Sequence, residues 1–236
     1  MKITTMTHNI NSGLIEINDY FKTAFSVDCV IFGFDGKDLK VLLIRSFANE
    51  FFGDWAVVGD LISPEEDLDA AAYRVLRQRT GLDDIYLEQV HAFGQTNRHP
   101  LGRVVTVAYY SLINIKDYKE TAASYENTAT WHNVKEVGQL ELAFDHNQIL
   151  KACLEGLKKR LITHPVGSNL LPEKFTLTEL QALYEAILDK PLDKRNFRKK
   201  VLSMGILLDL DEVQKDVAHR PAKLYSFDAK GTLSNW

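Results

Sequence analysis

The residues of the clearest chemical character are six basic side chains gathered in one short stretch. Residues 190–200 read KPLDKRNFRKK and contain a single acidic residue. Such a cluster can neutralise the phosphates of a nucleic acid or of another polyanion. The alternative is a solvated helix face, which is the ordinary role of a run of charges. The choice between these two interpretations depends on the elements that present the cations.

The basic stretch is predicted to form a helix with two different faces. Phe197, Val201 and Met204 are spaced four and three residues apart and therefore point to one side, towards a core. The cations project from the other side or its flanks, as in a helix that enters a groove of DNA. A helix, a tight turn with Pro191, the basic helix and a terminal hairpin together outline a winged helix. The residues predicted to contact DNA are Lys190, Lys194, Arg195, Asn196, Arg198, Lys199, Arg220 and Lys223, the last two on the wing.

Charge and helical pattern divide the chain into two domains. Residues 1–150 carry a formal charge of −8 and residues 151–236 a charge of +4, within the total of −4. Asp145–Thr163 is predicted to be one long linker helix, and the sequence His164-Pro165-Val166-Gly167 ends it. We therefore expect an N-terminal domain over residues 1–163 and a C-terminal domain over residues 164–236. The composition, 45% hydrophobic and 25% charged, is that of globular proteins.

The N-terminal domain is predicted to be a strand-rich α+β domain. The connection Asp35-Gly36-Lys37 between two apolar runs indicates a hairpin. Ser63–Thr80 has the apolar spacing of a helix, and Ser63 and Glu66 have the spacing of a capping box. Asn11–Phe25 is predicted to be an amphipathic helix or an extended lead-in. The predicted strands are Ser26–Phe34, Leu39–Arg45, Trp55–Val58, Ile85–Thr96, Arg103–Ile115 and Thr130–Val134.

In the C-terminal domain, Thr176 and Glu179 again have capping-box spacing, and an apolar face follows them. The basic helix is predicted over Asp193–Met204. Two short strands, Ile206–Asp209 and Lys223–Phe227, are predicted to close the domain.

The features that are absent narrow the class of protein. No run of about 18 uncharged apolar residues exists, and the first residues have no apolar core of a secretion signal. Cys29 and Cys153 are too few for a disulfide framework or a cysteine zinc site, and Cys29 is expected in the core. The common phosphate-loop and hydrolase motifs are missing. We expect a cytoplasmic protein without a cofactor.

Residues 55–82, WAVVGDLISPEEDLDAAAYRVLRQRTGL, resemble the Nudix box. That family pattern is Gly, five residues, Glu, seven residues, then Arg-Glu-apolar-x-Glu-Glu-x-Gly-apolar. Glu66 and Arg74 have the family spacing, and Leu76, Gly81 and Leu82 fall in register. Asp60 stands where the family has its opening Gly. The resemblance implies a Nudix-like α/β/α sandwich with a mixed sheet, in which Glu66 and Arg74 brace the loop around the helix.

The three carboxylate positions of the family pattern are occupied here by Val75, Gln78 and Arg79. In the family these carboxylates hold the Mg²⁺ or Mn²⁺ that neutralises a diphosphate and activates water. Valine supplies no ligand, glutamine supplies a neutral one, and arginine places a cation where the metal would bind. The resemblance therefore implies a Nudix domain that is not an enzyme, with no catalytic residues and no metal.

A metal-free Nudix-like domain followed by a winged helix resembles the Nudix-related transcriptional regulators of the NrtR-like family, over residues 24–227. The sequence looks closest to the arabinose-responsive AraR branch. The resemblance implies a homodimer that binds a double-stranded DNA operator and responds to a small molecule. L-Arabinose is the expected effector, and repression of sugar-utilisation genes is the expected role. The alternative within the family is a sensor of ADP-ribose or NAD-related nucleotides.

The expected effector site is the cleft beside the Nudix helix. A negative charge at Asp60 would repel a phosphate, so the residues favour a neutral ligand such as a sugar. Each residue predicted for this site could equally have an ordinary surface or packing role. The residues predicted to bind the effector are Arg45, Trp55, Asp60, Arg79, Gln95 and Arg98.

The expected mechanism couples the two domains. The free dimer would present its two basic helices about 34 Å apart, at successive major grooves. Effector binding would favour a different spacing, and the long helix over Asp145–Thr163 is a candidate for carrying the change.

Two rival functions remain. One is a hydrolase that uses Glu65, Glu66 and Asp69 as an atypical ligand set, and the other is an interaction module whose basic helix binds an acidic protein.

Overall fold

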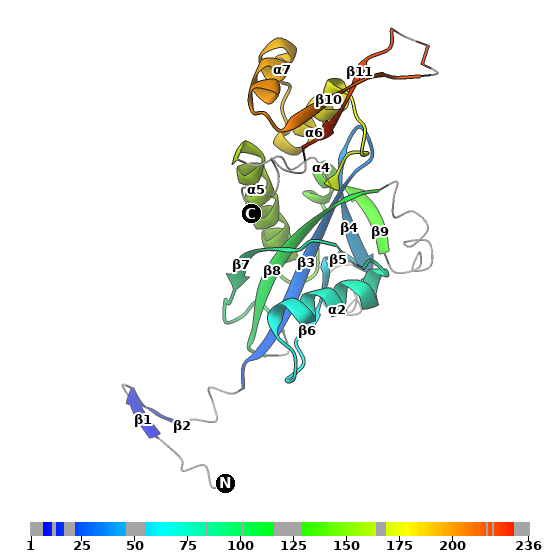
Figure 1. Cartoon of the computed structure of the whole chain (residues 1–236). Helices are drawn as coiled ribbons and strands as arrows, with labels where there is room; N and C mark the ends of the chain where they lie inside the picture. Colours follow the sequence, from blue (N-terminus) through cyan, green and yellow to red (C-terminus); the bar gives the residue numbers. More distant parts are fainter. Residues whose placement is uncertain are drawn as a thin grey trace.

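The computed structural model describes residues 7–10, 13–16, 22–45, 55–83, 85–100, 102–115, 129–163, 169–215, 217–218 and 220–228. Within these ranges a mixed sheet with helices on both faces is followed by a smaller domain of helices and a hairpin (Figure 1). This is the predicted architecture, an α+β sandwich followed by a winged helix. In these ranges no helix has the length and apolar character needed to cross a membrane.

Strand β3 (Ala24–Phe34) is the centre of the main sheet because it pairs along both edges. It runs parallel to β8 (Val104–Asn114) and antiparallel to β4 (Leu39–Arg45). The other described strands of this sheet are β5 (Trp55–Ala56), β6 (Val58–Leu61), β7 (Glu88–Phe93) and β9 (Ala129–Asn133). All six predicted strands of the domain are therefore present, although Trp55–Val58 is divided between β5 and β6.

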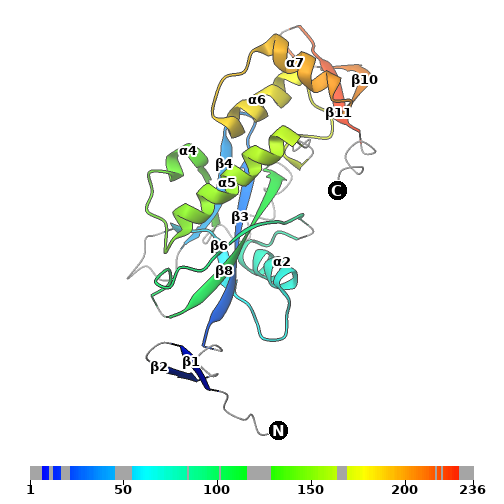
Figure 2. The same ribbon diagram turned by 90° about the vertical axis from the view of Figure 1, so that its left-hand side faces the viewer.

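The sheet is buried on both faces, and alternate residues of β3 face different cores. Val27, Cys29 and Ile31 pack beneath helix α2 (Leu68–Thr80). Val30 and Phe32 belong to the core that contains helix α5 (His146–Thr163). Because successive strand side chains point to opposite faces, a nearly continuous apolar run is what a strand between two helical layers requires. Figure 2 shows α2 and α5 on opposite sides of the sheet. Cys29 is fully buried, as predicted.

The predicted start of α2 is wrong by five residues. The helix begins at Leu68, and the side chain of Asp67 caps it by accepting a hydrogen bond from the Ala70 N–H at 2.9 Å. Ser63 and Glu66 lie before the helix, in a turn where Glu66 Oε1 accepts from the Ser63 N–H at 2.7 Å. The capping-box spacing was misleading because the Glu66 carboxylate also binds Arg74, which lies on the helix itself.

The C-terminal domain consists of α6 (Leu177–Leu188), α7 (Lys194–Ser203), β10 (Leu207–Val213) and β11 (Lys223–Phe227). The predicted capping box at the start of α6 is confirmed, since Thr176 and Glu179 bond to each other's backbone N–H groups. Strands β10 and β11 form an antiparallel hairpin beside α7 (Figure 1).

The two domains share one hydrophobic core. Leu157 and Leu161, at the far end of α5, belong to the same buried cluster as Leu180 and Ile187 of α6. An ion pair of 2.6 Å between Lys135 of α4 (Val134–Val137) and the residue that caps α6, Asp189, joins the domains at the surface. The predicted joint at residues 164–167 lies outside the described residues.

The described residues of the N-terminal segment form a small hairpin. Strands β1 (Thr7–Ile10) and β2 (Gly13–Glu16) pair antiparallel. Of the two alternatives for Asn11–Phe25, the described parts are therefore extended at β2 and at the start of β3. Residues 11–12 and 17–21 of that segment lie outside the described ranges.

Candidate functional site

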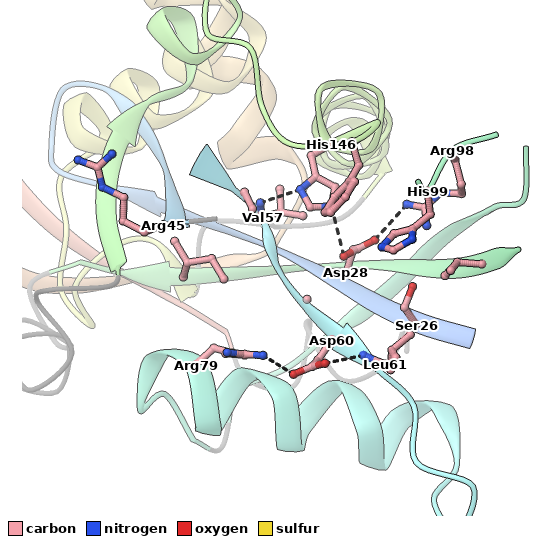
Figure 3. A pocket seen from close by; sticks show the side chains of 15 residues that line it. Ser26, Asp28, Arg45, Val57, Asp60, Leu61, Arg79, Arg98, His99 and His146 are labelled. Carbon is pink, nitrogen blue, oxygen red and sulfur yellow. Dashed lines mark hydrogen bonds and ion pairs between the residues drawn. The ribbon is translucent and has the colours of Figure 1, made fainter. Parts of the chain in front are cut away.

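A cavity of about 210 Å³ lies where the sheet, α2 and the start of α5 meet (Figure 3). Strand β3 contributes Ser26 and Asp28, and β6 contributes Asp60. Helix α2 contributes Arg79, and the connection between β7 and β8 contributes Arg98. The full lining is Ser26, Asp28, Ile44, Arg45, Ala56, Val57, Gly59, Asp60, Leu61, Arg79, Arg98, His99, Val104, Phe144 and His146.

Arg98 and Asp28 of this wall form a buried cluster with Asp145, which consists of one cation and two carboxylates. The Arg98 guanidinium donates Nε–H to Asp145 Oδ2 at 2.9 Å and Nη2–H to Asp145 Oδ1 at 2.6 Å. The same Nη2 atom lies 3.5 Å from Asp28 Oδ2. The side chains of Arg98, Asp28 and Asp145 are only 3%, 7% and 9% exposed. Buried charges persist in proteins when they are paired in this way.

His146 ties the first turn of α5 to the sheet. Its Nδ1 atom accepts a hydrogen bond from the Val57 N–H at 3.2 Å, and its Nε2 atom lies 3.7 Å from Asp28 Oδ1. Because Nδ1 is the acceptor, the neutral ring carries its proton on Nε2, facing the carboxylate. Burial is the main cause that lowers the pKa of His146 below the usual value for histidine, although Asp28 and Asp145 act in the opposite direction.

This lowered pKa predicts a loss of stability in acid. Below a pH of about 6.5 the unfolded chain binds a proton at His146 that the folded chain resists, so the free energy of unfolding falls as the pH decreases. Arg98 and His99, which face the same ring, also lower its pKa. The expected slope from this group is at most about 1.4 kcal/mol per pH unit. Urea titrations between pH 8 and 5 should show a flatter profile for His146→Gln than for the wild type. The exposed His91 provides the control, and an equally flat profile for His91→Gln would contradict the assignment.

The positions that hold metal in the Nudix pattern have different contacts here. Val75 is a buried apolar residue of the core beneath α2. Gln78 Oε1 accepts a hydrogen bond from Arg74 Nη1 at 3.1 Å. Arg79 Nη2 forms an ion pair with Asp60 Oδ2 across the cavity. Within the described ranges, no three His, Cys, Asp or Glu side chains converge as metal ligands. The residues present therefore do not fit the divalent ion of the family.

Glu66 and Arg74 form the brace that the Nudix resemblance implies. Arg74 donates Nε–H to Glu66 Oε2 at 2.8 Å and Nη2–H to Glu66 Oε1 at 2.5 Å. The same guanidinium donates to the Leu61 carbonyl at 3.0 Å, so it fastens the loop before α2 to the helix. The hydrogen bonds from Arg74 and Ser63 lower the pKa of Glu66 to about 2. This carboxylate is thus charged and engaged at neutral pH.

The structure brings together four of the six residues predicted to bind the effector, since Arg45, Asp60, Arg79 and Arg98 line the cavity. Trp55 is outside the lining, but its indole ring contacts Arg45, whose guanidinium lies 4.3 Å from the ring centre. Gln95 is exposed in the β7–β8 connection and contributes only its carbonyl, which accepts from the Arg98 N–H at 3.3 Å.

Sequence reasoning missed Ser26, Asp28 and His146 of the lining, and also Asp145, which holds Arg98. Asp28 did carry a signal, because it is a carboxylate inside the otherwise apolar run SVDCVIFGF, where a buried charge demands a partner. The partner, Arg98, is 70 residues away in sequence, and no local pattern indicates it.

Six of the eight predicted DNA-contacting residues lie on or next to α7 and divide into three groups. Lys194, Arg195 and Lys199 are exposed on α7, while Phe197 and Val201 anchor the opposite face in the core. Arg198 is half-buried and donates to the Thr178 hydroxyl on α6 at 3.3 Å. Lys190 and Asn196 line a separate cavity between α6, α7 and the end of α5.

The two predicted wing residues lie on or next to the β10–β11 hairpin. Arg220 is exposed, and Lys223 forms an exposed ion pair with Asp209 at 2.8 Å. On α7, the exposed face opposite Phe197 and Val201 carries Arg195 and Lys199, which are one helical turn apart.

Comparison with known proteins identifies relatives of both domains. Residues 22–153 match the family model of the NUDIX domain, and residues 167–227 match that of the NrtR DNA-binding winged helix domain. A relative from Acinetobacter baylyi, the ADPR responsive transcriptional repressor NtrR, is 37% identical over 89% of this chain and 84% of its own length.

Two crystal structures of NrtR from Shewanella oneidensis are similar to this chain. The complex with a 27mer DNA has a TM-score of 0.76 at 31% identity, over 89% of this chain and 95% of the other. The NUDIX domain complexed with ADP ribose has a TM-score of 0.50 at 27% identity, over 61% of this chain and 94% of the other.

Proposed function

The chain belongs to the NrtR-like family of transcriptional regulators, in which a Nudix domain is joined to a winged-helix DNA-binding domain, and we propose that it is a repressor that ADP-ribose releases from its operator. The observation that carries the proposal is the combination of a cavity lined by three arginines with an outward-facing basic helix at opposite ends of one structure. The relatives described above support the same pairing of ligand and DNA.

The choice of ADP-ribose over L-arabinose rests on the charge of the cavity. An uncompensated charge at Asp60 would repel a phosphate and favour a neutral ligand. Asp60 is instead paired with Arg79, so its charge is already compensated. Arg45 and Arg98 also line the cavity, and their guanidinium groups carry the paired N–H donors that bind a diphosphate, although Arg98 also holds Asp145 and lies near Asp28. A relative and a solved structure are named for ADPR and ADP ribose, so the nucleotide alternative is better supported than the arabinose-responsive branch.

The proposed role of the Nudix domain is recognition without hydrolysis. Of the three carboxylates in the atypical ligand set, Glu66 is held by Arg74, and Asp69 accepts a hydrogen bond from the Tyr109 hydroxyl at 2.9 Å. Glu65 is exposed in the turn before α2. With Mg²⁺ or Mn²⁺ present, we expect no release of AMP from ADP-ribose above that of the protein-free control. Metal-dependent turnover would support the hydrolase rival instead.

The test of the whole proposal is release of DNA by a ligand. A fluorescent fragment carrying the protein's own promoter region should bind at 100 mM salt, and ADP-ribose should lower the anisotropy while L-arabinose leaves it unchanged. Retention of the fragment against a scrambled competitor would separate sequence-selective binding from general affinity for acidic polymers. Binding of two chains per operator is also proposed, and mass photometry of the complex measures it. Release by L-arabinose instead of ADP-ribose would overturn the proposed ligand.

A further inference from the structure

Phe144 and His146, which flank Asp145 at the start of α5, form part of the wall of the effector cavity. Phe144 places its ring in the cavity wall, stacked on His99 with ring centres 4.8 Å apart. Asp145 holds the Arg98 guanidinium, and His146 accepts the hydrogen bond from Val57. The corner formed by residues 144–146 is therefore in contact with the β7–β8 connection and with the sheet at once. Figure 3 shows His146 and Arg98 converging on Asp28.

The backbone of this corner has an unfavourable conformation. Phe144 has a φ of 57°, in the left-handed region, where the Cβ of a bulky residue meets the backbone. Such a conformation persists only where the surrounding structure holds it. Here the neighbours on both sides are tied down, because the Ala143 N–H donates to the Trp55 carbonyl at 2.8 Å and Asp145 is bound by Arg98. The corner is thus a strained segment kept in place by a small number of identifiable bonds.

The other end of the same helix packs on the DNA-binding domain. Leu157 and Leu161 of α5 share a core with Leu180 of α6. Helix α6 in turn contacts the basic helix, since the rings of Tyr184 and Phe197 lie 5.2 Å apart with a near-perpendicular orientation. Figure 2 shows α5 running from the sheet to the underside of α6. A change in direction at the start of α5 would therefore reach α7 through packed side chains alone.

The Arg98 guanidinium can serve either of two partners. Its planar fork binds a carboxylate or a phosphate through the same paired N–H groups, so a diphosphate in the cavity competes directly with Asp145. Asp145 can give up this partner because it immediately precedes α5, where the helix dipole favours a negative charge. An effector shifts a conformational equilibrium only by its different affinity for the two states, and this exchange of partners supplies the difference.

We propose that the effector acts by taking Arg98 from Asp145, which frees the strained corner at residues 144–146 and changes the direction of α5 against the winged helix. This inference rests on the proposed function, because it assigns the step by which ADP-ribose binding lowers affinity for the operator. Asp145 acts here as a positioning residue, since it holds Arg98 and α5 together in the DNA-binding state.

The test uses Asp145→Asn in the full-length chain. Loss of the carboxylate weakens the bond that defines the DNA-binding state, so operator binding without effector should weaken at least tenfold. By linkage, ADP-ribose should bind the free variant more tightly, by roughly three- to tenfold, and its remaining effect on DNA affinity should shrink. Opposite changes in the two affinities cannot arise from general misfolding, which would weaken both. The matched control is Glu141→Gln, an exposed acid four residues earlier, for which both affinities should stay within twofold of the wild type.

A second measurement needs no variant. Hydrogen exchange of the amides at residues 146–150 in the wild-type protein should accelerate when ADP-ribose is added, because the first turn of α5 loses its anchor. Unchanged protection there during DNA release, or unchanged affinities in Asp145→Asn, would overturn the inference while leaving the proposed function in place. A wild-type protein that does not respond to ADP-ribose would instead overturn the proposed function itself.

Discussion

Replacing Arg195 and Lys199 together by alanine is expected to weaken operator binding by roughly 2–4 kcal/mol, about 30- to 1,000-fold at fixed salt. Both side chains are exposed on α7, opposite the face anchored by Phe197 and Val201. They are therefore placed to contact bases or phosphates without supporting the domain. The slope of log affinity against log salt should also flatten by about one for each phosphate contact removed. Anisotropy titrations at several salt concentrations measure both quantities.

The control for this pair is Lys151→Ala combined with Lys159→Ala. These two lysines are exposed on α5, so the control changes the net charge equally without touching α7. We expect less than a threefold change in operator affinity. An equal loss of affinity in both double variants would show that general charge, and not the basic helix, governs binding. Arg198→Ala should have a mixed effect, because Arg198 also bonds to Thr178 of α6 and helps to place α7.

Replacing Arg98 by methionine is expected to lower the free energy of unfolding by about 3–5 kcal/mol. The substitution keeps most of the side-chain volume but removes the cation shared by Asp28 and Asp145. Two buried carboxylates would then face each other without compensation, which is costlier than the loss of a single hydrogen bond. Urea unfolding at pH 7.5, followed by circular dichroism, measures the change.

Arg103→Met provides the comparison for that prediction. Arg103 precedes β8, and its guanidinium donates to the Gly94 carbonyl at 2.5 Å, in the same connection as Arg98. It is half-buried. We therefore expect a loss of at most about 1 kcal/mol. If Arg98→Met lowered the free energy of unfolding no more than Arg103→Met, the ion pairs of Arg98 with Asp28 and Asp145 would not be a major source of stability.

The sequence predicts most elements of the fold because their signals are local. The capping box of α6 and the apolar runs of β3 and β8 depend on neighbours within a few residues. The start of α2 was misplaced for the opposite reason. Glu66 has the right spacing from Ser63 for a cap, but Arg74 engages its carboxylate from the helix. A tertiary partner decided what a local pattern could not.

The candidate site was harder to predict than the fold, because its members are spread through the sequence. Asp28, Arg98 and Asp145 come from a strand, a connection and the residue before a helix, and only Asp28, a carboxylate in an apolar run, carries a local signal. Asp60 and Arg79 were both recognised, yet their ion pair was not, so the charge at Asp60 was taken to exclude phosphates. The net charge of a cavity depends on which residues form ion pairs, and the sequence does not show those pairs.

The hydrophobic core common to α5 and α6 limits how such a protein can be rearranged by recombination. A cut between the two domains would leave Leu157 and Leu161 on one fragment, and Leu180 on the other, facing water. A sensor borrowed from an unrelated protein could not replace this one unless it ended in a helix with a matching apolar face. Diversification of ligand choice is therefore easier by substitution around the cavity than by exchange of whole modules.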